Sequence, residues 1–249
     1  MFNNRFYIPV IFILVLIIMF SFILDVQAVS TYEQAVAEKN LQRLNEEYDL
    51  TRMEEGDFEW QVFNNLTDQL RSDGINLKFR LYYAQTEEVN GLYIGDGNII
   101  IFSGLADILT EEELAALIAH EMGHGIHKHL DENLRNNLGF FAGRFFLDRL
   151  FGEKAASSEF YQRFVGLAMN LLDKGFSREQ EREADIYAVQ LLDRTPEYRP
   201  SGMVGLLTKL KDLRRRKDPE ILEIFNTHPY PENRLEYTQD EIREIEAGY

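Results

Sequence analysis

The chain opens with hydrophobic residues that leave no polar face. Residues 6–24 are almost entirely Ile, Leu, Val and Phe, are interrupted by Pro9 and Ser21, and carry no charge. A helix of roughly 20 such residues can cross the hydrocarbon core of a membrane. Arg5 precedes the stretch and Asp25 follows it, so the positive-inside tendency leaves the N-terminus in the cytoplasm and the rest of the chain outside.

Residues 1–28 are therefore expected to be separate from a single domain at residues 29–249. The small residues around Val26 and Ala28 also suit a signal peptidase, so a cleaved signal peptide competes with a transmembrane anchor. The apolar run is longer than the roughly 7 to 15 residues of a usual signal core, which favours the anchor. Both alternatives export the domain.

Helical and strand periods follow one another in the first part of the domain. Residues 32–53 carry a loose apolar stripe, and a second helix begins at Asp57 and ends before Gly74. Hydrophobic residues at every second position from Ile75 to Tyr83 predict a half-buried strand. The turn pair Asp96-Gly97 between two short apolar runs predicts a hairpin.

The remainder of the chain has a helical period. Thr110 with Glu113, and Ser177 with Gln180, match the capping box that starts a helix, and Ser201 suits the start of a third helix. The expected fold class is α+β, mainly helical, with a small β-sheet.

Composition restricts the chemistry of this domain. The formal net charge of −16 lies outside the first 28 residues, which argues against a nucleic-acid partner, because phosphate binding needs clustered Lys and Arg. The chain has no cysteine, so a metal would be held by His, Asp or Glu. It has five histidines, and four of them lie between His120 and His129.

His120-Glu121-Met122-Gly123-His124 forms an H-E-x-x-H motif on the helix that follows Thr110. A spacing of four residues puts both imidazoles on one helical face, where they can bind one zinc ion. Glu121 projects beside them and can take a proton from a water that attacks a carbonyl. A five-residue motif in which two positions can be any residue also arises by chance, so a third ligand has to support the assignment.

Glu181 is the candidate for that third ligand. It shares a face of the second capped helix with Asp185, four residues later, and Asp185 could accept a hydrogen bond from a ligand imidazole. Ala184 and Ala188 are small enough to let the two helices approach. Glu179 and Glu183 are the alternatives, and they project from other parts of the helix.

Together these motifs resemble a family of zinc metallopeptidases that includes the heat-shock protease HtpX and the type-I CAAX prenyl endopeptidase. That family has H-E-x-x-H followed by E-x-x-A-D on a later helix, here residues 181–185, with Ser177-Arg178 just upstream. A single apolar segment makes the chain similar to the small periplasmic branch. The resemblance implies a zincin-like domain with an active-site helix and one Zn²⁺ per chain, held by His120, His124 and Glu181.

The resemblance also implies a substrate-binding strand and a second catalytic residue. The strand at Asn98, Ile99, Ile100, Ile101 and Phe102, with Asn90-Gly91-Leu92, is similar to the family's edge strand, to which an extended peptide can add. Thr227-His228-Pro229 is similar to a late His-Pro segment. His228 is then expected either to bind the metal at the open position or to stabilise the oxyanion.

Three further features are expected to be structural or to lie on the surface. The resemblance implies a structural role for His129, and His127 is expected on the surface. Most aromatic residues between Phe140 and Phe176 are expected in the core.

The leading functional hypothesis is a zinc-dependent endopeptidase that cuts unfolded or misassembled cell-envelope proteins. It would bind polypeptides in an extended conformation and lie in the periplasm or on the inner membrane, held there by the N-terminal helix if that helix is uncleaved. The alternative is a catalytically quiet, zinc-binding chaperone or assembly factor of the envelope. An accidental motif in a membrane-tethered scaffold would bind no zinc.

Overall fold

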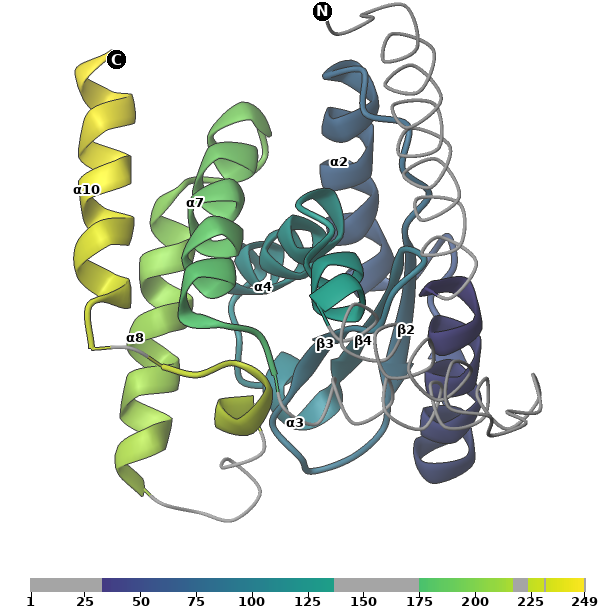
Figure 1. Cartoon of the computed structure of the whole chain (residues 1–249). Coiled ribbons are helices and arrows are strands. Elements are labelled where there is room, and N and C mark those ends of the chain that lie inside the picture. Colours follow the sequence, from purple (N-terminus) through teal and green to yellow (C-terminus); the bar gives the residue numbers. More distant parts are fainter. Residues whose placement is uncertain (1–32, 137–174, 217–223, 231, 249) are drawn as a thin grey trace, which may run out of the picture.

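The computed structural model describes residues 33–136, 175–216, 224–230 and 232–248 (Figure 1). The predicted membrane or signal segment, residues 1–28, and most of the aromatic segment lie outside the described residues. Within the described parts of the chain, no helix is both long and apolar enough to span a membrane.

A four-stranded sheet forms one side of the domain. Its strands are β1 (Thr51–Arg52), β2 (Arg80–Ala84), β3 (Gly91–Tyr93) and β4 (Asn98–Phe102), in the order β1-β2-β4-β3. β2 and β4 are parallel, and the outer pairs are antiparallel. All five residues of β4 are buried, as expected for a strand that is covered on both faces. β3 and β4 confirm the predicted hairpin, with positive φ at Asp96 and Gly97 in its turn.

The expectation that Asn98, Ile99, Ile100, Ile101 and Phe102 form the free edge of the sheet is wrong. β4 pairs along its whole length with β2 and also with β3, so its main-chain groups are already used within the sheet. The edges of the sheet are β1 and β3, and β3, the edge beside β4, contains Gly91 and Leu92 of the expected edge segment. A run of β-branched residues is typical of an inner strand, because burial on both faces leaves no need for polar alternation.

Helices cover the sheet and build the rest of the domain, which confirms the mainly helical α+β fold. Residues 33–48 and 129–136 are helical. The named helices are α2 (Phe58–Ser72), α3 (Ser103–Ala106), α4 (Glu111–Ile126), α7 (Arg178–Arg194), α8 (Ser201–Arg216) and α10 (Arg234–Ala247). Figure 1 shows α4 in the middle of the domain, and it contacts α2, α7, α8 and β3.

Both predicted capping boxes are present. The Thr110 hydroxyl accepts from the backbone N–H of Glu113, whose carboxylate accepts from the backbone N–H of Thr110. Ser177 and Gln180 make the same reciprocal pair at the start of α7. Each box satisfies N–H groups that the first helical turn leaves free, so the sequence fixes where α4 and α7 begin.

Two predicted elements are shorter in the structure. The first helix ends at residue 48, and β1 follows it, where the stripe predicted helix to Met53. The strand predicted from Ile75 begins only at Arg80, which pairs with Asn98, the first residue of β4. Residues 75–79 alternate as a strand would, but the partner strand does not extend far enough to pair with them.

α4 and α7 cross in close contact at a glycine. A Cβ built at Gly123 would lie 3.0 Å from the Cα and 3.1 Å from the carbonyl oxygen of Ala184. Both residues are therefore small because the two backbones nearly touch there. Gly123 lies within H-E-x-x-H and Ala184 within E-x-x-A-D, so this crossing sets the distance between the two motifs.

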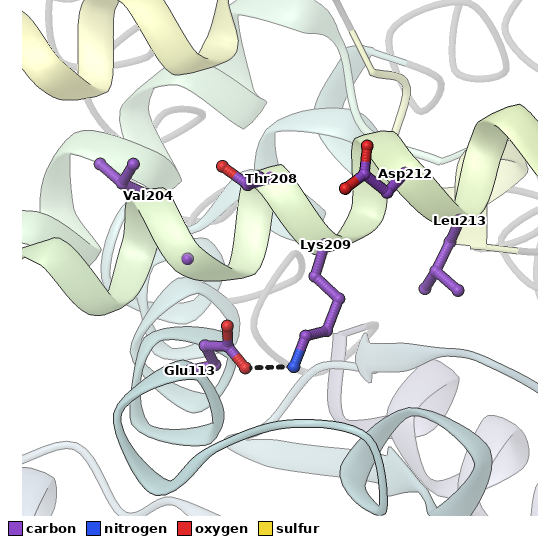
Figure 2. Close-up of a pocket in the computed structure, with 7 residues that line it drawn as sticks. Glu113, Val204, Thr208, Lys209, Asp212 and Leu213 are labelled. Carbon is purple, nitrogen blue, oxygen red and sulfur yellow. Dashed lines mark hydrogen bonds and ion pairs between the residues drawn. The ribbon is translucent and has the colours of Figure 1, made fainter.

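An open cavity of about 410 Å³ lies along α8, away from those motifs. Residues of α8 line it together with Glu113 of α4, as Figure 2 shows. The Lys209 ammonium lies 2.6 Å from the Glu113 carboxylate across this cavity. The ion pair ties α8 to the start of α4.

Candidate metal centre

Three predicted ligands and His228 converge in the interior. His120 and His124 come from α4 and Glu181 from α7, and His228 follows a helical turn at residues 224–227. The Nε2 atoms of His120 and His124 are 3.2 Å apart, and Glu181 Oε1 lies 3.4 Å from His124 Nε2. His228 Nδ1 lies 3.4 Å from His120 Nε2.

These separations fit a zinc ion. Ligand atoms about 2.0–2.1 Å from a tetrahedral zinc lie roughly 3.3 Å from one another. The donors are imidazole nitrogen and carboxylate oxygen, which zinc prefers in the absence of thiolates. All four side chains are buried, so bulk water does not compete with an ion for their ligand atoms.

The charges in the cluster suit metal binding. Burial lowers the pKa of His124 well below its usual value, which keeps the imidazole neutral and able to donate a lone pair. Burial raises the pKa of the Glu181 carboxyl, but the positive charges of His228 and Arg234 outweigh it and hold that pKa well below its usual range. His124 and Glu181 therefore favour the neutral imidazole and the charged carboxylate that a metal ion binds.

Asp185 lies behind His120. Its Oδ1 atom is 2.9 Å from His120 Nδ1, which leaves Nε2 facing the cluster, as expected from the spacing in E-x-x-A-D. Burial raises the pKa of the Asp185 carboxyl, but Arg234 and His120 together lower it by more, so the net shift is downward. The Tyr237 hydroxyl also donates to Asp185 at 2.5 Å.

Arg234, at the first residue of α10, balances both carboxylates. Its Nε and Nη2 donate to Asp185 at 2.8 Å and 2.5 Å, and its Nη1 lies 2.9 Å from Glu181 Oε2. Its side chain is 3% exposed. A buried arginine with two buried carboxylates keeps their charge without leaving any of them unpaired.

Glu121 stands apart from these pairs. It is fully buried, yet among the described residues neither of its carboxylate oxygens has a hydrogen-bond partner. The nearest ionisable contact is His228 Nε2, 3.5 Å from Oε1. Burying a carboxylate without a hydrogen-bond donor costs free energy. The two oxygens are therefore suited to accept from a water or a substrate N–H at the cluster.

His228 connects the cluster to the edge of the sheet. Its Nδ1 lies 3.0 Å from Glu181, and its Nε2 lies 3.0 Å from the carbonyl oxygen of Gly91 in β3. Burial lowers the pKa of His228, but Glu181 and Glu121 raise it more, to about 9. The sequence predicts Gly91 in the edge strand but could not show that His228 contacts it.

Further residues surround His124. The Phe176 ring stacks on its imidazole, with centroids 3.7 Å apart and planes 17° apart. Its Nδ1 lies 2.8 Å from His129 Nδ1, and His129 Nε2 lies 2.9 Å from Glu183. His129 is buried, whereas His127 is exposed as expected.

Sequence reasoning assigned no role to Phe176 or Arg234 at this centre, and it considered Glu183 only as an alternative third ligand, whereas Glu183 contacts His129 in the structure. The only signals were the position of Arg234 soon after the His-Pro segment and of Phe176 at the end of an aromatic run. Neither pattern says which buried group a side chain reaches, because that depends on how distant helices pack. Asp185 could be predicted because it shares a helical face with Glu181, but Phe176 and Arg234 have no such spacing to a ligand.

Comparison with known proteins agrees with this geometry. The chain is 28% identical to the metalloprotease LoiP of Escherichia coli over 181 residues, which are 73% of this chain and 68% of that protein. It is 29% identical to the beta-barrel assembly-enhancing protease of Escherichia coli O157:H7 over 70% of this chain, but over only 37% of that protein. Protease HtpX of Legionella pneumophila is 27% identical over 54% of the chain and 50% of its own length.

A family model matches residues 69–242, a range that contains both motif helices and His228. That model describes peptidase family M48, whose members are metalloproteases that use zinc. The match covers more than half of the chain and therefore extends well beyond the short motifs. We conclude that the chain belongs to peptidase family M48 and is a zinc-dependent metalloendopeptidase.

Proposed function

We propose that the chain cuts unfolded or misassembled polypeptides of the cell envelope, with the residues of the central cluster in the roles that follow. The observation that carries the proposal is the buried carboxylate of Glu121, which accepts no hydrogen bond from the described residues, beside two imidazoles and a carboxylate at ligand spacing. Zinc-dependent peptide hydrolysis needs this combination of ligands and a free base.

His120, His124 and Glu181 would hold the zinc ion. A zinc ion in this site supplies Lewis acidity, which acidifies an attacking water and polarises the scissile carbonyl. Asp185 fixes the tautomer of His120 by occupying Nδ1, and Arg234 keeps Asp185 and Glu181 charged.

Glu121 acts as the general base. It takes a proton from the attacking water, and it later passes that proton to the departing amine, so that the carboxylate is regenerated at the end of the cycle. Among the described residues neither of its oxygens accepts a hydrogen bond, and the nearby His228 Nε2 is 3.5 Å from Oε1, so the carboxylate can accept the proton of a water.

His228 stabilises charge on the substrate carbonyl oxygen when it swings towards a bound peptide. Its two ring nitrogens lie near two acceptors, Glu181 and the Gly91 carbonyl, and its pKa is raised to about 9, which supports a protonated imidazole that can donate. A substrate that pairs with β3 would compete for the Gly91 carbonyl and release His228 at the same time.

The envelope assignment rests on relatives and on the sequence. One relative is named for enhancing beta-barrel assembly, a process of the outer membrane, and residues 6–24 predict export. Both support unfolded or misassembled envelope proteins as the substrates, and an uncleaved N-terminal helix would hold the enzyme at the inner membrane.

Glu121→Gln tests the function. The amide has nearly the shape of the carboxylate but cannot accept a proton, so cleavage of casein should fall by at least about a hundredfold. Zinc content, measured by mass spectrometry on the purified full chain, should stay at the wild-type value, because Glu121 is not a proposed ligand.

Glu236→Gln, a change on the first turn of α10, is the matched control and should cleave casein at the wild-type rate. Undiminished cleavage by Glu121→Gln would remove the proposed base. An inactive wild-type protein that retains zinc and binds casein would favour the chaperone over the peptidase.

A further inference from the structure

A second group of potential metal ligands lies beside the central cluster. His127, His129 and Glu183 each offer one ligand atom, and these atoms lie within 4.8 Å of one another. His127 and His129 are stacked with ring centroids 5.4 Å apart and planes 13° apart. His129 is buried, whereas the Glu183 side chain is 47% exposed and His127 faces solvent.

The backbone brings the two imidazoles to the same side. His127 caps the end of α4, and Lys128 has a positive φ of 57° that turns the chain between the two histidines. Glu183 reaches them from α7. The donors come from the end of α4, the start of the helix at residues 129–136, and α7, and the two exposed side chains can close around an ion by rotation about their own side-chain bonds.

We propose that His127, His129 and Glu183 form a second, solvent-facing binding site for a zinc-type divalent ion, and that filling this site opposes peptidase activity. Two imidazoles and one carboxylate are ligands that zinc prefers, and the exposure of the group leaves room for water at the remaining position. Partial exposure and only three protein ligands make this site weaker than the buried one.

Hydrogen bonding couples the two sites. His124 Nδ1 and His129 Nδ1 are 2.8 Å apart, so only one hydrogen fits between them. If His124 binds zinc through Nε2, its hydrogen lies on Nδ1 and is donated to His129. His129 then carries its own hydrogen on Nε2 and donates it to Glu183.

An ion in the second site needs the lone pair of His129 Nε2. The hydrogen there must move to Nδ1, where it would meet the hydrogen of His124. The contact that orients His124 is thereby lost, and orientation of a ligand imidazole by an outer partner supports metal binding and activity. A filled second site should therefore weaken the catalytic centre.

Equilibrium dialysis of the full chain in detergent, started with one zinc per chain, tests the site. With rising Zn²⁺ the wild type should bind a second equivalent, and casein cleavage should fall over the same concentration range. His127→Ala should keep wild-type cleavage at one zinc per chain. It should bind the second zinc at least about tenfold more weakly, because losing a ligand costs no less affinity than losing an outer partner. The zinc concentration that inhibits casein cleavage should rise by the same factor.

Glu179→Gln is the matched control, because it removes an exposed carboxylate one turn before Glu183 on α7, and it should titrate as the wild type does. A wild type that never exceeds one zinc, or a second zinc unaffected by His127→Ala, would overturn the site. Inhibition that does not shift in His127→Ala would place the inhibitory ion at the catalytic centre and overturn the coupling. The dialysis arm stands apart from the proposed function, so failure of the Glu121→Gln test leaves it interpretable.

Discussion

At the scale of single residues, the metal centre depends on opposite charges that pair with one another in the protein interior. Glu181 and Asp185 are both fully buried, and Arg234 contacts both of them. Neither carboxylate could stay charged there alone, because transfer of an unpaired charge to the interior is very costly. The ligand helix α7 is thus stabilised by the first residue of α10.

Replacing Arg234 should therefore reduce stability strongly. Arg234→Met should lower the free energy of unfolding of the metal-free protein by about 3–5 kcal/mol, because two buried carboxylates lose their cation. Denaturant unfolding followed by circular dichroism measures the change.

Arg243→Met is the matched control on α10. Arg243 pairs with Asp240 at the surface, where ion pairs contribute only about 0–1 kcal/mol. Equal losses for both variants would mean that Arg234 stabilises the protein only through its place on the helix.

At the scale of elements, the crossing of α4 and α7 decides whether the two motifs meet. Gly123 and Ala184 are the contact points, one residue away from His124 and three from Glu181 along the chain. Each motif thus contains metal-ligand candidates and also the small residue that lets the other helix approach: Gly123 in the first motif and Ala184 in the second.

Gly123→Val should separate the ligands. A side chain at this position meets the backbone of Ala184 and must push the helices apart, at a cost of about 1–3 kcal/mol for overpacking. Zinc affinity, measured by competition with a chelator, should fall by at least about tenfold, because small displacements of a ligand set weaken metal binding.

Glu112→Val is the matched control, since its side chain is exposed on the same helix. Unchanged zinc affinity in Gly123→Val would show that the crossing tolerates a wider separation than the contact suggests.

A second contact between elements responds to pH. Glu33, at the start of the first described helix, accepts from Tyr93 of β3 and from the backbone N–H of Asp96. Burial and the nearby charge of Asp131 raise the pKa of Glu33 to about 7, although the hydrogen bond from Asp96 lowers it. The folded protein therefore binds this proton more tightly than the unfolded chain does.

The sign of the effect follows from that difference. Stability from Glu33 is greatest below its unfolded pKa of 4.5 and is lost as the pH rises towards about 7. Glu33→Gln should flatten this decline and raise the thermal midpoint at pH 8. Glu38→Gln, exposed on the same helix, should follow the wild-type curve, and a parallel decline in Glu33→Gln would contradict the assignment.

At the scale of the whole molecule, the cluster joins distant parts of the chain. Its residues come from α4, α7 and the segment before α10, which together with β3 surround the centre. An ion bound there links these elements in the folded state alone, so ligand binding adds directly to stability.

Zinc removal should therefore lower the thermal midpoint as well as abolish cleavage. Free zinc at about 1,000 times its dissociation constant stabilises a folded protein by about 4 kcal/mol. Differential scanning calorimetry before and after chelation measures this, and Mg²⁺ should not restore the midpoint because it prefers oxygen ligands. An unchanged midpoint would mean that the ion binds the unfolded chain equally well.

The sequence by itself determined the starts of α4 and α7, the hairpin, and the placement of His120 and His124 on one helical face, because caps, turns and the four-residue spacing are local signals, whereas Glu181 was expected beside them from the family resemblance. The tertiary structure decided which strands form the edges, where strand pairing stops, that α4 and α7 bring Glu181 to the two histidines, and which residues besides Asp185 stand behind the ligands. β4 lies between two strands and Arg234 faces two carboxylates through contacts between segments far apart in the chain. Such contacts depend on packing, which no local pattern records.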